Sequence, residues 1–417
     1  MVSIQPISHA LVPRDSDATK QISAQNYDEF QSDREVWEIL QKQPESLLRV
    51  TMPHCHVASP REFLTDGSQL ALEHAAAQMT RLADHSLVRK VENLLWIYEI
   101  TSPQRPELPQ WGLGGCGRTA EIRTDQNPSG SIVRNEGIHP DKMLGRAKLL
   151  TAIQCDTGFV NLAVRDKAGV LLRALELTGA SRPCDFETVD EGGNRHRVWL
   201  VTDAKEIATW QKLLAEESAA YVADGNHRSA AAAHLGCEQF MTVFFPASRM
   251  GLEPYNRLLP PPPFPRDEFL RRLAAHFEVE PLPGSETRHG YRPPQTHTLG
   301  MYLPGQWYRL RVRPTAFDPT DAADAIDAQI VQRHLIAGLY GFDDARNKKI
   351  NYVGGNKDAA YLQSRVDSGD YGCALSLAPV TMDQFVAVCE QNKFMPPKST
   401  WFDPKIRTGL VMSLLRK

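Results

Sequence analysis

The chain has 417 residues, of which 42% are hydrophobic and 23% are charged, and its net charge is −3. These values are typical of a globular protein with two or three domains, and they exclude a generally basic surface for nucleic acid or anionic membrane. No apolar run approaches the roughly 18 residues that cross a bilayer, and the N-terminus lacks a secretion-signal pattern. The seven cysteines are scattered without a CxxC pair, which predicts neither a disulfide framework nor a zinc module and favours the cytoplasm.

The first part of the chain is expected to alternate helices and strands after a polar, loop-rich beginning of about 40 residues. Apolar periodicity and β-branched or aromatic runs are the signals for these elements. The predicted helices are 33–43, 70–82, 143–154, 170–177 and 204–217. The predicted strands are 46–50, 93–101, 119–123, 159–164 and 241–245.

Two short motifs in this part have the composition of a binding site, but the sequence around them does not support that function. His54-Cys55-His56 offers metal-ligating side chains, but neighbours on a strand point in alternate directions and rarely bind one ion together. The glycine-rich run 112–117 has the composition of a dinucleotide-binding loop, but no amphipathic helix follows it. We therefore expect no metal at 54–56, and a flexible turn or bulge at 112–117.

Glu136 lies in a loop between a predicted strand and the helix predicted at 143–154. A carboxylate in such a place acts as a general base when a substrate hydroxyl lies within hydrogen-bonding distance. The alternative is a solvated or capping loop carboxylate, although Asp141 is the better candidate for the helix cap. The pattern alone leaves both interpretations open.

The turn Asp224-Gly225-Asn226-His227-Arg228 carries the most concentrated polar chemistry of the chain. It follows a short β-prone segment and opens an alanine-rich helix. N–H groups in the first turn of a helix have no internal acceptor and lie at the positive end of the helix dipole, so they attract phosphate. The same pattern also fits an ordinary strand-to-helix turn capped by Asp224 or Asn226. We favour a nucleotide-phosphate site, because a carboxylate, an imidazole and a guanidinium accompany these donors.

A proline run at 260–263 predicts a boundary between two domains. The expected division is a first domain at 1–258, a linker at 259–266 and a C-terminal domain at 267–417. The C-terminal domain is expected to be α+β, with helices at 267–276, 321–339 and 382–390, a hairpin of strands 297–303 and 307–312, and strands at 350–353 and 371–377.

The C-terminal segment 395–410 combines prolines, which fix an extended path, with Lys398, Ser399, Thr400 and Lys405. Such cations and hydroxyls on a rigid loop are able to bind phosphate oxygens. The alternative is a solvated loop anchored by its aromatic residues.

Several motifs together resemble the domain of unknown function 1015 family over nearly the whole chain. The family's opening Ala-Pro-Pro-Tyr-Asp element corresponds to Ala24-Gln25-Asn26-Tyr27-Asp28. Its His-Glu-x-Thr element corresponds to residues 135–138, and its Ala-Asp-Gly-His-His-Arg signature to residues 223–228. Tyr255-Asn256-Arg257 and the ending at 395–410 also match, and the ending is the most specific part.

The Asp-Gly-x-His-Arg signature is in turn similar to that of the ParB/sulfiredoxin-like superfamily, which includes free serine kinases. The resemblance implies an α+β fold, with a mixed-sheet ParB/sulfiredoxin-like nucleotide-binding core, its elaborations, and a second α+β domain. It also implies that ATP or ADP, accompanied by Mg²⁺, binds with its phosphates on Gly225, Asn226, His227 and Arg228.

The same resemblance assigns roles to individual residues. Glu136 becomes the catalytic base, while His227 orients a phosphate oxygen and Arg228 stabilises the charge on the transferred phosphoryl group. Asp224 holds Mg²⁺ or fixes the loop. Lys398 and Lys405 close over the phosphates.

The chain departs from the family pattern at several of these places. Gln25 and Asn26 replace the two prolines, and the His-Glu-x-Thr element has lost its His and its Thr. The first His of the signature is Asn226, which can bond a phosphate or cap the helix but cannot shuttle a proton. These departures indicate a substrate outside the family norm, or weak activity.

Two hypotheses about function follow. The first is a small-molecule kinase that transfers a phosphoryl group from ATP or ADP to the hydroxyl of a small metabolite such as free serine. The alternative is a nucleotide-binding sensor or scaffold protein without transfer, and a hydrolase using water is a third, weaker interpretation. Sulfiredoxin chemistry is not expected, because that activity needs a cysteine where Asn226 lies. No basic helix follows Phe264, so no nucleic-acid partner is expected; no membrane partner is expected either, and an oligomer is compatible with the sequence.

Overall fold

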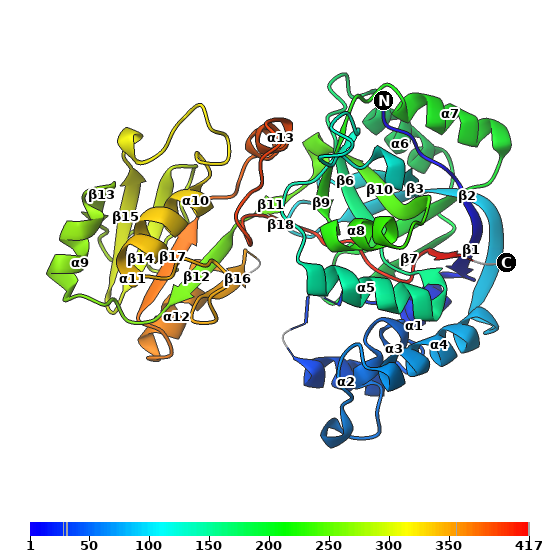
Figure 1. The fold of residues 1–417 in the computed structure, drawn as a ribbon, viewed down its shortest axis with the longest axis horizontal. Helices are drawn as coiled ribbons and strands as arrows, with labels where there is room; N and C mark the ends of the chain where they lie inside the picture. The colour runs from blue at the N-terminus through cyan, green and yellow to red at the C-terminus, as the bar shows by residue number, and fades with distance from the viewer. Residues whose placement is uncertain (28, 31, 356, 416–417) are drawn as a thin grey trace. The chain divides into compact units, whose positions relative to one another are not determined.

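The computed structural model describes residues 1–27, 29–30, 32–355 and 357–415, which form two compact units (Figure 1). The first unit is Met1–Met250 with Pro404–Lys417, and the second is Gly251–Asp403. Each unit combines helices with a large sheet, so the α+β fold class is confirmed. Within the described residues, no helix has the length and apolar character needed to cross a membrane.

The first unit is built on an 11-stranded mixed sheet with the strand order β4-β9-β6-β10-β3-β2-β1-β19-β5. The pairs β4–β9 and β6–β10 are parallel, whereas β8 extends the sheet antiparallel from β2 and carries β7 on its far side. The strands are β1 (Ile7–Pro13), β2 (Val88–Thr101), β3 (Gln110–Arg118), β4 (Ile132–Val133), β5 (Cys155–Asp156), β6 (Val160–Val164), β7 (Phe186–Val189), β8 (Arg195–Val201), β9 (Ala220–Asp224), β10 (Gln239–Pro246) and β19 (Met412–Leu414).

Two helix groups bury apolar stripes against this sheet. One core cluster unites α6 and α7 with β2, β3, β6 and β9, and a second cluster unites α4 and α5 with β1, β5 and β19. The described α-helices of the unit are α1 (Ser16–Ile22), α2 (Asp33–Lys42), α3 (Leu48–Thr51), α4 (Gln69–Ala83), α5 (Pro140–Ile153), α6 (Val170–Ser181), α7 (Ala204–Leu214) and α8 (Asn226–His234), and short 3-10 helices include η1 (Pro53–Cys55) and η3 (Thr119–Glu121).

The glycine-rich run 112–117 is the interior of strand β3, so the expected turn or bulge is wrong. Its glycines are needed for packing: a Cβ on Gly114 would lie 1.9 Å from the Trp96 ring, and one on Gly112 would lie 2.5 Å from Val243. Because these positions of β3 are glycines, large side chains of the neighbouring strands fit against the strand. The strand expected at 119–123 is instead the 3-10 helix η3.

The second unit has a six-stranded antiparallel sheet with the order β13-β15-β14-β17-β12-β16, and a separate pair of β11 and β18. The strands are β11 (Leu252–Glu253), β12 (Tyr255–Leu259), β13 (Phe277–Pro281), β14 (Thr298–Leu303), β15 (Gln306–Val312), β16 (Asn351–Gly354), β17 (Cys373–Leu377) and β18 (Trp401–Phe402). The described helices include α9 (Arg266–Leu273), α10 (Asp327–Val331), the π-helix η6 (Gln332–Ala337), α11 (Gly338–Tyr340), α12 (Ala359–Asp367) and α13 (Met382–Glu390). The expected hairpin is present as β14 and β15.

The compact units differ from the expected domains in two respects. Strand β12 pairs with β16 and β17 of the second sheet, so the proline run at 260–263 follows a strand of that sheet and does not separate the units. The C-terminal residues return to the first unit, because β19 pairs with β1 and β5. Nor is the N-terminus mainly loop, since it forms β1 and α1, and the strand expected at 46–50 is largely the short helix α3.

Candidate functional site

The turn between β9 and α8 has the geometry of an open helix N-terminus. Gly225 adopts φ = 92°, a left-handed conformation that favours glycine, and it precedes α8 as the capping residue. A Cβ on Gly225 would lie 3.1 Å from both Arg228 Nε and Val160 Cα, so there is little space for a side chain. No described side chain caps this helix.

The first N–H groups of α8 divide into two kinds. Those of Arg228 and Ser229 donate to the Gly225 carbonyl oxygen, at 2.9 and 3.0 Å. Those of Asn226 and His227 have no acceptor among the residues that the structure describes. Together with the helix dipole, these two donors are able to bind an anion.

Arg228 lies over the same turn within a network of polar side chains. Its guanidinium forms an ion pair with Asp224 at 2.9 Å and donates to Asn26 Oδ1 at 3.4 Å. Asn26 Nδ2 in turn donates to the Ile406 carbonyl oxygen at 2.7 Å. The Arg228 side chain is only 11% exposed, so its charge acts in a partly desolvated environment. The family-like element at residues 24–28 thus contributes to the site through Asn26, while Asp28 lies outside the described residues.

His227 is held as a neutral ring. Burial is the main cause that lowers its pKa to about 4, and the charges of Lys142 and His139 lower it further. His227 Nε2 accepts a hydrogen bond from the His139 backbone N–H at 3.0 Å. The neutral ring therefore carries its proton on Nδ1, which makes Nδ1 the only donor it can offer an anion.

The loop that carries Glu136 lies beside the first turn of α8. Two hydrogen bonds connect them: the one from His139 to His227, and one of 2.8 Å from Asn226 Nδ2 to Asn135 Oδ1. Glu136 is partly buried and lies between these two anchor points in the sequence. The structure therefore brings together the two sequence motifs that were predicted to form one site.

A cavity of about 60 Å³ adjoins Arg228. Helix α5 supplies its apolar wall through Leu149, Leu150 and Ile153, and β5 with the following loop supplies Cys155, Asp156, Thr157 and Gly158. The remaining lining residues are Asn26, Tyr27, Thr51, Arg146, Arg228, Ala231 and Thr408. Glu136 is not among them, so a molecule in this cavity is not in contact with that carboxylate.

Sequence reasoning missed two polar residues of the cavity. Asp156 is half-buried, and its carboxylate accepts from the N–H groups of Met241 and Gly158, at 3.0 and 3.2 Å. Burial nevertheless raises its pKa. Arg146 places its guanidinium 3.8 Å from the centre of the Tyr27 ring. The sequence signal that could have identified Asp156 is the Asp-x-Gly pattern of residues 156–158 ahead of a buried strand. No sequence signal singles out Arg146, because an arginine in a helix is ordinary.

The two predicted phosphate-binding lysines belong to different units. Lys405 is a partly buried residue of the first unit, next to Ile406, whose carbonyl oxygen binds Asn26. Lys398 belongs to the second unit, where its ammonium lies 3.2 Å from the Tyr255 hydroxyl and 4.8 Å from the centre of that ring.

The side chains at the turn do not suit a resident magnesium ion. Asp224 already pairs with Arg228, which favours the loop-fixing role of the two expected for it. The described residues contain one group of three potential metal ligands, and it lies elsewhere, at Asp33, His54 and Cys55. Any magnesium at the turn would depend on phosphate oxygens for most of its ligands.

Comparisons with known proteins give one family and several remote structures. No curated protein sequence matches the chain. A free serine kinase in complex with AMP is 10% identical with a TM-score of 0.34, and the match covers 65% of this chain and 83% of that one. A conserved hypothetical protein from Pyrococcus furiosus is 11% identical with a TM-score of 0.34, and the match covers 66% of this chain and 89% of that one. C-terminally truncated SbnI from Staphylococcus aureus is 12% identical with a TM-score of 0.35, and the match covers 66% of this chain and 80% of that one.

Such low scores say nothing about the chemistry of this chain's site. The match to a family is more extensive, because it runs over residues 4–335 and so spans most of both units. The chain therefore belongs to the protein family of unknown function DUF1015.

Proposed function

We propose that the turn between β9 and α8 binds the phosphates of a nucleotide, and that the protein is a small-molecule kinase. One observation carries the proposal: an uncapped helix N-terminus with a left-handed glycine lies directly under a partly desolvated guanidinium. Backbone donors, a helix dipole and an arginine on the same turn are the combination that recognises phosphate oxygens.

Each residue of the turn has a defined task in this proposal. The N–H groups of Asn226 and His227 bind phosphate oxygens, and His227 Nδ1–H donates a further hydrogen bond. Arg228 stabilises the charge on the terminal phosphoryl group while Asp224 holds the guanidinium in place. Of the two lysines predicted to bind phosphate, Lys405 belongs to the same unit as the turn, and in this proposal it adds a second cation.

Glu136 is the proposed general base. In the transfer step, the acceptor's hydroxyl oxygen forms a bond to the terminal phosphorus as Glu136 takes the hydroxyl proton. The bond from phosphorus to the bridging oxygen breaks, and the nucleotide departs with one phosphate fewer. The acceptor binds on the Glu136 side of the turn, because Glu136 does not line the cavity next to Arg228.

The test is an acceptor screen. The full chain is incubated with ATP, ADP or CTP, magnesium, and a panel of amino acids and polyols, and nucleotide products are quantified by chromatography. The proposal predicts nucleotide consumption that depends on one class of hydroxyl acceptor, with a phosphorylated acceptor in equal amount. Consumption without any acceptor would indicate a hydrolase instead.

A nucleotide sensor without transfer is the second candidate, and one observation favours it. Asn226 and Asn135 stand where the family pattern has histidines, and in this chain they bond to each other at 2.8 Å. This bond engages the amide N–H of Asn226 and the amide oxygen of Asn135, so these two groups hold the loop to the helix instead of contacting a substrate. A sensor would show nucleotide binding and a thermal shift in the same screen, but no phosphorylated product.

A further inference from the structure

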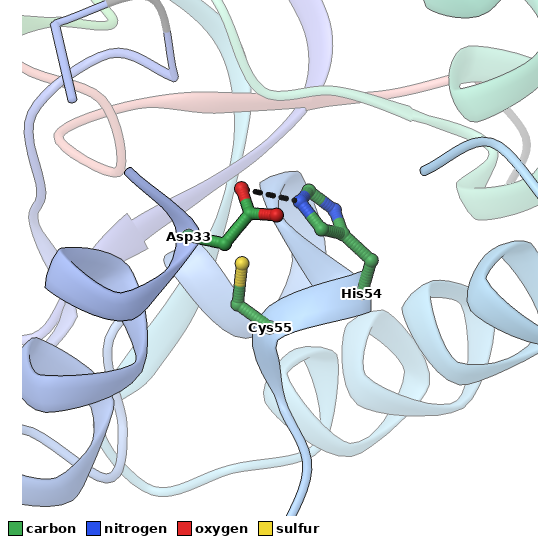
Figure 2. Close-up of side chains that lie close together, drawn as sticks. All are labelled: Asp33, His54 and Cys55. Atoms are coloured by element: carbon green, nitrogen blue, oxygen red, sulfur yellow. Dashed lines mark hydrogen bonds and ion pairs between the residues drawn. The ribbon is translucent and has the colours of Figure 1, made fainter. Parts of the chain in front are cut away.

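Three potential metal ligands meet in the N-terminal elaboration, well separated in sequence from the α8 turn. Asp33 is the first residue of α2, and His54 and Cys55 lie in the 3-10 helix η1 (Figure 2). One ligating atom from each lies within 4.8 Å of the others. The side chains of His54 and Cys55 both point toward Asp33 (Figure 2), whereas adjacent side chains on a strand would point in alternate directions.

The cluster is buried on one side and accessible on the other. The side chain of His54 is 5% exposed, and Cys55 is fully buried in a small core with Val36, Leu40 and Met52. Asp33 is 52% exposed, so an ion can reach the cluster from solvent. This geometry combines rigid nitrogen and sulfur donors with an adjustable carboxylate.

The His54 ring lies between two carboxylates. Its Nε2 is 3.2 Å from Asp33 Oδ1, and its Nδ1 is 3.4 Å from Asp66 Oδ1. Only Nε2 makes a hydrogen bond, to Asp33, whereas the buried Nδ1 has no hydrogen-bond partner among the described residues. A neutral imidazole has one N–H and can donate to only one carboxylate. A cation bound by Nε2 and Asp33 would replace their hydrogen bond and leave the N–H on Nδ1, where it faces Asp66.

The distances and donor types fit a zinc-like ion. Two ligands with bonds of about 2.0–2.1 Å to a tetrahedral zinc are roughly 3.3 Å apart, close to the observed separation of His54 Nε2 and Asp33 Oδ1. Imidazole, thiolate and carboxylate are all established zinc ligands. A carboxylate on the far ring nitrogen, here Asp66, is the usual outer partner of a metal-bound histidine.

We propose that Asp33, His54 and Cys55 bind one divalent transition metal of the zinc class, with Asp66 orienting the histidine and water completing the coordination. Nothing in the proposed kinase function requires this site. Its effect is structural, because the ion joins the start of α2 to η1. The small core around Cys55 also contacts Tyr27, which lines the cavity next to Arg228.

Metal binding must displace the proton of the Cys55 thiol. Burial and the carboxylates of Asp33 and Asp66 raise the pKa of the Cys55 thiol to about 12. A metal must displace this proton, so binding releases a proton and weakens as the pH falls.

The test uses the full chain, stripped of metal with a chelator and titrated with cobalt(II) as a spectroscopic probe. We expect one equivalent to bind, with the near-ultraviolet charge-transfer band of a cobalt–thiolate bond, and zinc to displace it. Cys55→Ser should abolish the band. Asp33→Asn, a change at an exposed carboxylate that should leave folding intact, should weaken cobalt affinity at least tenfold.

Matched controls keep the result interpretable. Cys237→Ser alters a partly exposed cysteine outside the cluster and should leave the band unchanged. Asp66→Asn should weaken binding less than Asp33→Asn, because Asp66 contacts only the far side of the ring. The proposal is overturned if folded wild-type protein gives no thiolate band with cobalt, or if the band persists in Cys55→Ser. An Asp33→Asn variant with wild-type affinity would remove Asp33 from the ligand set and contradict the site as described.

Discussion

Two strand-to-helix junctions of the first unit differ in whether a side chain caps the N-terminus of the helix. Between β8 and α7, Asp203 caps the helix, and its side chain accepts from the N–H groups of Lys205 and Glu206 at 3.0 and 2.9 Å. Between β9 and α8, the capping residue is Gly225, which has no side chain to do so. One terminus is satisfied within the protein, and the other keeps backbone donors beside Arg228.

If stability alone determined the sequence, α8 would also be expected to have a side-chain cap. A side-chain cap typically stabilises a helix by about 1 kcal/mol. At α8 this stabilisation is absent, and a guanidinium adds positive charge to the positive end of the dipole. Asp224 offsets part of that charge through its ion pair, and a bound anion would offset the rest.

The largest expected effect concerns transfer at the open junction. Glu136→Gln should lower the turnover of phosphoryl transfer by about 10²- to 10⁴-fold, since it removes the base but keeps the shape of the side chain. Nucleotide affinity, measured by calorimetry, should change little. Full turnover in this variant would show that Glu136 is not the base.

The next effect concerns nucleotide affinity. Arg228→Ala should raise the dissociation constant of the nucleotide about 10- to 100-fold, because charged hydrogen bonds contribute roughly 1.5–3 kcal/mol. Arg228→Lys serves as the control: it keeps the charge but loses the fork geometry, so its affinity should be intermediate. If both variants bind as tightly as wild type, phosphate does not contact this residue.

Changing each capping residue tests the comparison most directly. Gly225→Ala should destabilise the fold by about 1–2 kcal/mol, since alanine at a left-handed φ is strained, and it should also weaken nucleotide binding. Asp203→Ala should cost about 1 kcal/mol through loss of the α7 cap while leaving nucleotide binding unchanged. Denaturant unfolding and calorimetry on both variants measure the two effects separately. If the two variants weakened nucleotide binding equally, the α8 junction would have no special role in binding.

The smallest effect is a pH dependence of stability from His227. Its folded pKa is lowered to about 4, below the ordinary 6.5, so the unfolded chain binds the proton more readily. The contribution of neutral His227 to stability is therefore complete above pH 6.5 and is lost as the pH falls toward 4. The stability difference between wild type and His227→Gln should decrease over that window. A difference that is constant from pH 7 to pH 4 would contradict the neutral, buried ring.

Local patterns predicted the elements of this chain better than their assembly. Helices with clear periodicity, such as α4 and α13, and the β14–β15 hairpin were predictable because their signals are local. The glycines of β3 were misread because their role depends on Trp96 and Val243, which lie on other strands. The return of the C-terminus to the first unit rests on the pairing of β19 with β1, some 400 residues apart in sequence, and no local pattern encodes it.

The candidate site was predictable to a similar extent. Asp224, Gly225 and Arg228 were identified from chain-local chemistry, and the structure adds the Asp224–Arg228 pair. Asn26 reaches Arg228 only through the folded arrangement of distant segments. The sequence argued against a metal at 54–56 on the geometry of a strand, and it did not predict the cluster with Asp33, which is remote in sequence; residues 53–55 instead form a 3-10 helix.

The central claim is that the N-terminus of α8 binds polyphosphate. Isothermal titration of the full chain with ATP, ADP and CTP, in the presence of magnesium, tests it most directly when wild type and Arg228→Ala are measured side by side. The account predicts saturable binding of at least one nucleotide by wild type, weakened about 10- to 100-fold in the variant. No binding of any nucleotide, or equal affinity in both proteins, would contradict it.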